Sequence, residues 1–143
     1  MDPLISRFIG VIELLLRVRA RSRGELKRRL PAGASVGDLY VLDVILAADL
    51  IAMGDLARRL GITPATATAA ANRLVRNGWV VRVPDQDDRR VIRLAVTPHG
   101  RRMHEGYEVH REQLATSVLS RLSRDEATTL VNLLERIAVD RHA

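Results

Sequence analysis

The side chains with the greatest intrinsic reactivity are few in this chain, and no catalytic motif joins them. The 143 residues contain no cysteine, which excludes disulfides, thiol redox chemistry and cysteine ligands for zinc. The serines show no nucleophile elbow, and the glycines form no phosphate-binding loop. The sequence therefore predicts that the protein is not an enzyme and uses no cofactor.

Histidines and glutamates between residues 99 and 112 have metal-binding chemistry. His104 and Glu108 are four residues apart, so they share one face of a helix. A metal site needs such groups gathered around one point, and a solvated helix surface accounts for them without an ion. The sequence predicts no metal site and leaves metal sensing as an alternative. The residues concerned are His99, His104, His110, Glu105, Glu108 and Glu112.

A charged turn offers chemistry of another kind, directed at a polyanion. Residues 84–90 read Pro-Asp-Gln-Asp-Asp-Arg-Arg and separate two apolar runs, 79–83 and 91–97, which predict a β-hairpin. An arginine at the tip of a hairpin can enter the narrow, electronegative minor groove of DNA, and a neighbouring carboxylate can orient it. The plain alternative is a solvated turn.

The segment before this hairpin predicts a helix-turn-helix. Gly61 supplies the tight turn, and Thr63-Pro64 combines a hydroxyl N-cap with proline at the first helical position. In this motif the start of the second helix enters the major groove, where small side chains let the backbone approach the bases. The residues expected to face the groove are Thr63, Ala65, Thr66, Thr68, Ala69 and Asn72. The expected small core is Leu56, Leu60, Ile62 and Leu74.

Apolar periodicity places helices on both sides of this region. A stripe from Leu4 to Val18 predicts an N-terminal helix that fades into an arginine-rich stretch, and a seam from Met103 to Leu122 predicts a long helix after Pro98. The predicted fold is mainly α with a small β-wing. It comprises a helix over 1–30, a winged helix-turn-helix domain over 35–97 and helices over 98–143, with the flanking helices serving dimerisation.

The net charge favours a polyanionic partner. The formal charge is +6 and the sequence pI is about 11.1, which suits nucleic acid or an anionic membrane surface. No apolar run approaches the roughly 20 residues of a membrane span, and the N-terminal segment lacks the charge order of a signal peptide. We therefore expect a cytoplasmic protein with no membrane partner.

Residues from about 35 to 105 resemble the MarR family of winged-helix regulators. The turn at 56–62, the following helix at 63–74 and the segment 78–82 match that family. Its wing signature reads Asp-x-Arg, several residues, an apolar residue, a threonine and a nearby glycine. The matching residues are Asp88, Arg90, Val96, Thr97 and Gly100.

The resemblance implies a homodimer that binds a pseudo-palindromic operator in double-stranded DNA and regulates transcription, as a repressor. It implies that Arg90 enters the minor groove, with Asp88 as its positioning partner and Arg89 beside it. Arg73 and Arg76 are expected to contact phosphates. A sequence-independent architectural DNA-binding protein and a winged-helix module that binds protein are the alternatives.

Two further expectations follow from comparison with the family. Ala69, Ala70 and Ala71 stand where such helices often carry longer polar side chains, which predicts few direct base hydrogen bonds and greater reliance on the wing and on DNA shape. A small-molecule effector is expected to bind between the flanking dimerisation helices and the winged helix-turn-helix domain. The side chains expected to contact it are Tyr40, Tyr107 and His110, with ordinary core or interface roles as the alternative.

Overall fold

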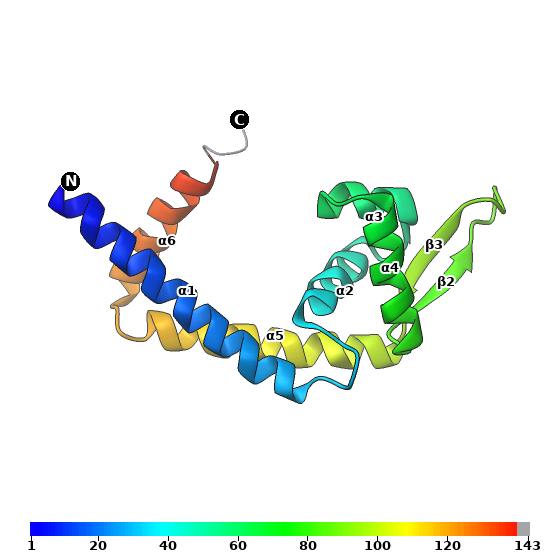
Figure 1. The fold of residues 1–143 in the computed structure, drawn as a ribbon, viewed down its shortest axis with the longest axis horizontal. Helices are drawn as coiled ribbons and strands as arrows, with labels where there is room; N and C mark the ends of the chain where they lie inside the picture. Colours follow the sequence, from blue (N-terminus) through cyan, green and yellow to red (C-terminus); the bar gives the residue numbers. More distant parts are fainter. Residues whose placement is uncertain (140–143) are drawn as a thin grey trace. The chain divides into compact units, whose positions relative to one another are not determined.

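The structure is a computed structural model that describes residues 1–139. By its internal contacts the chain divides into two compact units, Met1–Glu108 and the segment that begins at Val109. The described elements are six helices and a three-stranded antiparallel sheet (Figure 1), which confirms the predicted fold class. The division falls inside the long fifth helix, and the predicted domain boundary at residue 98 stays a prediction.

Helix α1, Pro3–Arg29, is longer than its apolar stripe. Asp2 caps it by accepting a hydrogen bond of 2.7 Å from the backbone N–H of Leu4, and Pro3 occupies the first turn. The helix continues through the arginine-rich half, where Ser22 and Leu26 are buried. Lys27, Arg28 and Arg29 occupy its last turn, where cations are favoured by the helix dipole.

The middle of the first unit contains α2 (Val36–Ala48), β1 (Ile51–Ala52) and α3 (Met53–Leu60). A capping box starts α2, in which Ser35 and Asp38 exchange side-chain to backbone hydrogen bonds of 3.1 and 3.2 Å. Gly61 ends α3 at φ 63°, a left-handed conformation that favours glycine. These local signals were all visible in the sequence.

Helix α4 (Pro64–Arg76) is followed by the hairpin strands β2 (Val80–Pro84) and β3 (Ile92–Val96). Gly78, at φ 74°, turns the chain from the helix into β2. The strands pair antiparallel with Val80 opposite Val96, and β1 pairs with the other edge of β3, giving the order β1-β3-β2. The sequence predicted the hairpin, but not the pairing of β1 with β3.

One aliphatic core holds this unit together. Leu42, Ile45, Leu56, Leu74 and Trp79 are each fully buried. The core joins α2, α3, α4 and the sheet, with Leu60 partly buried against it. Three of the four residues predicted to form the helix-turn-helix core, Leu56, Leu60 and Leu74, are thus part of a larger cluster, whereas Ile62 is not.

The last elements are α5 (Pro98–Leu119) and α6 (Arg124–Val139). Ser123 and Glu126 form a capping box before α6, with hydrogen bonds of 3.1 and 3.2 Å. From Val109 to Ala138 no residue is buried. Across residues 1–139, no helix is both long and apolar enough to cross a membrane.

A tight backbone junction joins α5 to the start of the hairpin. The Thr97 hydroxyl donates to the carbonyl of Gly78 at 2.6 Å and accepts from the N–H of Gly100 at 3.0 Å. The Thr97 N–H donates to the carbonyl of Trp79 at 2.9 Å. A Cβ on Gly100 would overlap that same carbonyl and lie 2.9 Å from Cγ1 of Val96. The threonine and glycine of the wing signature therefore have structural roles.

We predict that Gly100→Ala destabilises the protein, because the added methyl meets backbone that cannot move away. The expected loss in the free energy of unfolding is about 1–3 kcal/mol, the usual cost of overpacking. Gly106→Ala is the matched control, since nothing lies within 4 Å of a Cβ at that position of the same helix. It should gain about 0.5–1 kcal/mol from helix propensity. Urea denaturation measures both, and equal stability of the two variants would contradict the junction's role.

Candidate nucleic-acid interface

Helix α4 has two distinct faces. Ala67, Ala70, Ala71 and Leu74 repeat at three- and four-residue spacing and are buried. The six residues predicted to face a groove are all exposed: Thr63, Ala65, Thr66, Thr68, Ala69 and Asn72. The expectation that Ala69, Ala70 and Ala71 leave this exposed face short of polar side chains was wrong for Ala70 and Ala71. These two are buried, because their small side chains let α4 pack closely on the core. Ala69 alone of the three is exposed.

The threonines at the start of α4 use their hydroxyls locally. The Thr63 hydroxyl accepts from the N–H of Thr66 at 3.2 Å and lies 2.8 Å from the Thr66 hydroxyl. The Thr68 hydroxyl donates to the carbonyl of Pro64 at 2.9 Å. These side chains therefore stabilise the first turn, and they leave mainly methyl groups and oxygen lone pairs on the exposed surface.

Asn72 is held by the hairpin. The Arg82 guanidinium on β2 donates to the Asn72 side-chain oxygen on α4. Because arginine has no acceptor, the amide must turn its oxygen toward Arg82 and its NH₂ away. The exposed face of α4 thus presents an amide donor at this position, and sequence reasoning missed the arginine that orients it.

Arg73 and Arg76, both predicted to contact phosphates, differ in their surroundings. Arg73 donates through Nε to Asp38 Oδ1 at 3.0 Å, and the Asp38 side chain is fully buried at the N-terminus of α2. The Arg73 side chain is nevertheless 40% exposed. Arg76 is exposed on the last turn of α4. Arg73 therefore braces α4 against α2, a contact between residues 35 apart that periodicity could not reveal.

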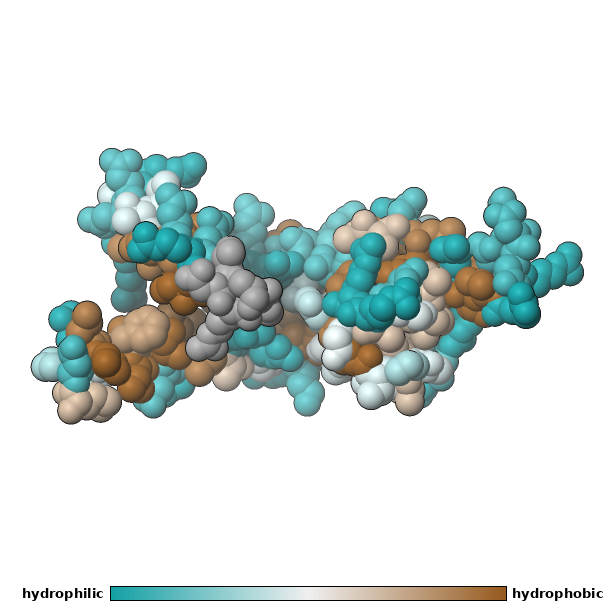
Figure 2. All heavy atoms as spheres, turned by 90° about the horizontal axis from the view of Figure 1, so that it is seen from above, coloured by the Kyte–Doolittle hydropathy of each residue, from teal (hydrophilic) through white to brown (hydrophobic). Residues whose placement is uncertain are grey.

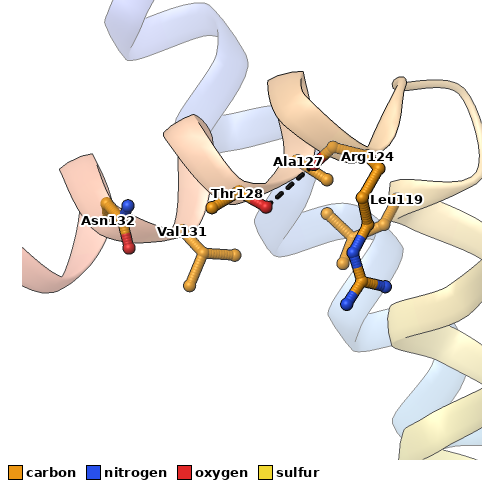
Figure 3. Close-up of a pocket in the computed structure, with 6 residues that line it drawn as sticks. All are labelled: Leu119, Arg124, Ala127, Thr128, Val131 and Asn132. Atoms are coloured by element: carbon orange, nitrogen blue, oxygen red, sulfur yellow. Dashed lines mark hydrogen bonds between the residues drawn. The ribbon is translucent and has the colours of Figure 1, made fainter.

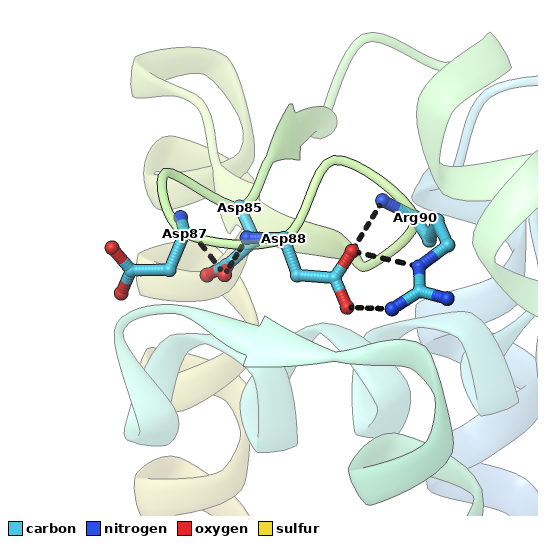
Figure 4. A network of polar contacts seen from close by, with 4 residues as sticks. All are labelled: Asp85, Asp87, Asp88 and Arg90. Carbon is cyan, nitrogen blue, oxygen red and sulfur yellow. Dashed lines mark hydrogen bonds and ion pairs between the residues drawn. The ribbon is translucent and has the colours of Figure 1, made fainter.

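The wing tip is organised around its carboxylates (Figure 4). Asp88 binds the Arg90 guanidinium in a fork, at 3.1 Å to Nε and 3.2 Å to Nη2, and accepts from the Arg90 N–H at 3.0 Å. Asp85 accepts from the N–H groups of Asp87 and Asp88 and from Arg93 Nε at 2.7 Å. The Arg90 side chain is 91% exposed, so it is oriented without being covered.

These contacts fix the charge of both carboxylates. The side-chain hydrogen bond from Arg90 holds the pKa of Asp88 below its ordinary value, and the one from Arg93 does the same for the pKa of Asp85. A lowered pKa means that the pairs are intact above the ordinary value of about 4 and are lost only as pH falls through the lowered one. Between pH 5 and 8 Asp85 and Asp88 therefore both stay ionised.

The predicted DNA-contacting residues of α4 and the wing thus lie in one unit, Met1–Glu108, and all are exposed except the partly buried Arg73 and Asp88. Arg89 is exposed beside Arg90. The wing tip is hydrophilic at the right of Figure 2. The predicted site omitted Arg82 and Arg93. Arg82 donates to Asn72 of α4, and Arg93 donates to Asp85 of the wing tip.

Comparison with known proteins shows which family this arrangement resembles. A family model described as "MarR family" matches residues 32–91. The multiple antibiotic resistance protein MarR of Salmonella typhimurium is 28% identical, over 95% of this chain and 96% of that protein. A mutant of MarR from Escherichia coli, solved with operator DNA, is 26% identical with a TM-score of 0.67, over 95% of this chain and 99% of that one. YusO of Bacillus subtilis has a TM-score of 0.81 at 22% identity, over 99% and 98% of the two chains.

The chain is similar to proteins of the MarR family and has their winged-helix fold, and these relatives support DNA-binding transcriptional regulation as its role. Its relatives are regulators and not enzymes, which agrees with the absence of a catalytic motif.

The residues predicted to bind an effector are not brought together into one site by the described contacts. Tyr40 is 54% exposed and Tyr107 packs against the core of the first unit, whereas His110 belongs to the second unit. The structure therefore leaves this prediction untested. A separate hollow of about 260 Å³ lies between the end of α5 and α6 (Figure 3). Its lining residues are Leu119, Arg124, Ala127, Thr128, Val131 and Asn132.

We predict that Arg73→Ala lowers the free energy of unfolding, whereas Arg76→Ala removes the same charge with little effect on it. Removing Arg73 leaves the buried Asp38 carboxylate without its cation, which should lower the free energy of unfolding by about 1–3 kcal/mol. Removing the exposed Arg76 should change it by no more than about 0.5 kcal/mol. Urea denaturation at neutral pH measures the difference. Equal stability of both variants would show that the Asp38 pair does not brace α4.

Proposed function

We propose that the protein is a homodimeric repressor that binds a two-fold symmetric operator through α4 and the wing. The observation that carries the proposal is the Asp88–Arg90 fork at an exposed hairpin tip, in the same unit as an exposed helix of small side chains. An exposed arginine held by a carboxylate is prearranged for the narrow minor groove. In this proposal α4 enters the adjacent major groove, and Arg76 and Arg73 contact the flanking phosphates.

The homodimer is supported by apolar surface that the chain does not cover itself. In the first half of α1, Leu4 is 69% exposed and Leu14 is 58% exposed, and the brown surface at the lower left of Figure 2 belongs to the first turns of this helix. In α6, Leu134 is 47% and Ile137 is 54% exposed. Contiguous apolar surface of this kind is characteristic of subunit interfaces. A second copy of the chain offers the same helices and is the proposed cover.

A small-molecule effector that relieves repression remains part of the proposal, with Tyr40, Tyr107 and His110 as the predicted contacts. A test of effector binding by release from DNA requires a known operator, so the operator must be identified first.

The decisive experiment is a footprint on the DNA that flanks the protein's own coding region, at fixed salt and with bulk competitor DNA. The expected result is a two-fold symmetric footprint with half-sites about one helical turn apart and affinity at least about a thousandfold above bulk DNA. Binding equal to that of bulk DNA would instead indicate the architectural alternative. Absence of binding at low salt would favour the protein-interaction module.

The wing predicts a specific pattern of mutational effects. Arg90→Ala should weaken operator binding by about tenfold or more, as expected for a lost base-groove contact. Asp88→Asn should also weaken it, because the fork that orients Arg90 is lost. Asp87→Asn removes the same charge from the same turn without touching Arg90, so it should leave binding unchanged or strengthen it. Affinities come from titration at one salt concentration, and an Arg90→Ala affinity within twofold of the parent would reject the role of the wing.

The fixed amide of Asn72 predicts base preference. With its oxygen held by Arg82, Asn72 offers only donors, which suits acceptors such as guanine N7 and O6 or thymine O4, and does not suit two-point binding of adenine. Arg82→Ala frees the oxygen and should shift one operator position toward adenine in selection from randomised duplexes. Arg76→Ala is the control and should weaken all sequences alike. An unchanged preference in Arg82→Ala would show that Asn72 does not read that base.

A further inference from the structure

Three potential metal ligands from two helices converge in the first unit. His104 Nε2 on α5 lies 2.8 Å from Asp43 Oδ1 on α2 and 3.7 Å from Glu108 Oε1, one turn along α5. The three ligand atoms all lie within 4.8 Å of one another. Among residues 1–139 this is the one group of three such side chains that comes together, and it lies apart from α4 and the wing in sequence.

We propose that Asp43, His104 and Glu108 form a binding site for a divalent transition-metal ion. Nitrogen and carboxylate ligands sit about 2.0–2.2 Å from zinc, so two ligand atoms on one tetrahedral ion are about 3.3 Å apart. The observed 2.8 and 3.7 Å lie on either side of that value. Small rotations of Asp43 and Glu108 therefore bring all three atoms into reach of one ion.

The burial of the three side chains suits an exchangeable ion. The His104 side chain is 14% exposed, which fixes the imidazole, whereas Asp43 is 35% and Glu108 is 47% exposed. Three protein ligands leave at least one coordination position for water, unlike a closed structural zinc site. One imidazole with two carboxylates suits zinc, iron(II) or manganese(II), and the imidazole disfavours calcium and magnesium.

A hydrogen bond between Asp43 and His104 explains only part of this arrangement. Glu108 Oε1 lies 3.7 Å from the same nitrogen, within ion-pair distance but beyond hydrogen-bonding distance, so two carboxylates flank one imidazole nitrogen. A bound ion would tie α2, which also contains the Asp38 partner of Arg73, to the first half of α5. Its expected effect is to stabilise the first unit.

The test uses tag-free, full-length protein stripped with a chelator and then dialysed against chelator-free buffer. Isothermal titration with Zn²⁺ and with Mn²⁺ should give one site per chain that is absent or at least about tenfold weaker in His104→Gln and in Asp43→Asn. The melting temperature of the parent should rise when metal is added, and that of the two variants should not. Circular dichroism checks that each variant is folded, and Asp43→Asn serves if His104→Gln is not.

Glu105→Gln is the matched control, because it removes one exposed carboxylate from the same helix but outside the cluster. Its metal affinity should equal that of the parent. The proposal is overturned if the parent binds neither ion, or if parent, His104→Gln and Asp43→Asn bind alike, which would indicate only scattered surface histidines. Neither readout involves DNA, so failure here is distinguishable from failure of the proposed repressor function.

Discussion

The contact between Gly100 and the backbone of Trp79 determines how the DNA-reading parts are placed. On one side the chain leaves α4 and enters β2, and on the other it leaves β3 and begins α5. Thr97 bridges the two sides with hydrogen bonds of 2.6, 2.9 and 3.0 Å. Because both hairpin strands meet α5 here, contacts to the backbone of Gly78, Trp79 and Gly100 fix the direction in which the wing leaves α4.

Ion pairs then hold α4, the hairpin and the arginine at the wing tip. Asp38 holds α4 through Arg73, Asp85 holds the hairpin through Arg93, and Asp88 orients Arg90. Arg73 and Arg93 are partly buried in these pairs, whereas the Arg90 side chain is almost fully exposed. Arginine suits both uses, because its fork can satisfy a carboxylate and it stays charged at every physiological pH. A high arginine content therefore reflects bracing as well as attraction to a polyanion.

Local features of the fold were predictable from the sequence, and contacts between distant residues were not. Thr63-Pro64, Gly61 and Gly78 predicted the ends of the helices because caps and left-handed glycines act within a few residues. The partners of Arg73 and His104 lie 35 and 61 residues away, and periodicity gives a face but not its neighbour. Ala70 and Ala71 were misplaced although their spacing with Leu74 already indicated the buried face.

One buried side chain gives the protein a spectroscopic property. Trp79 is the sole tryptophan, is fully buried, and has no hydrogen-bond partner for its indole N–H among the described residues. An indole in such a dry setting emits at short wavelength and shifts to the red when water reaches it. Tryptophan emission therefore reports on the winged-helix unit alone, whereas far-ultraviolet dichroism is dominated by all six helices. Loss of the two signals at different temperatures would reveal that the units melt separately.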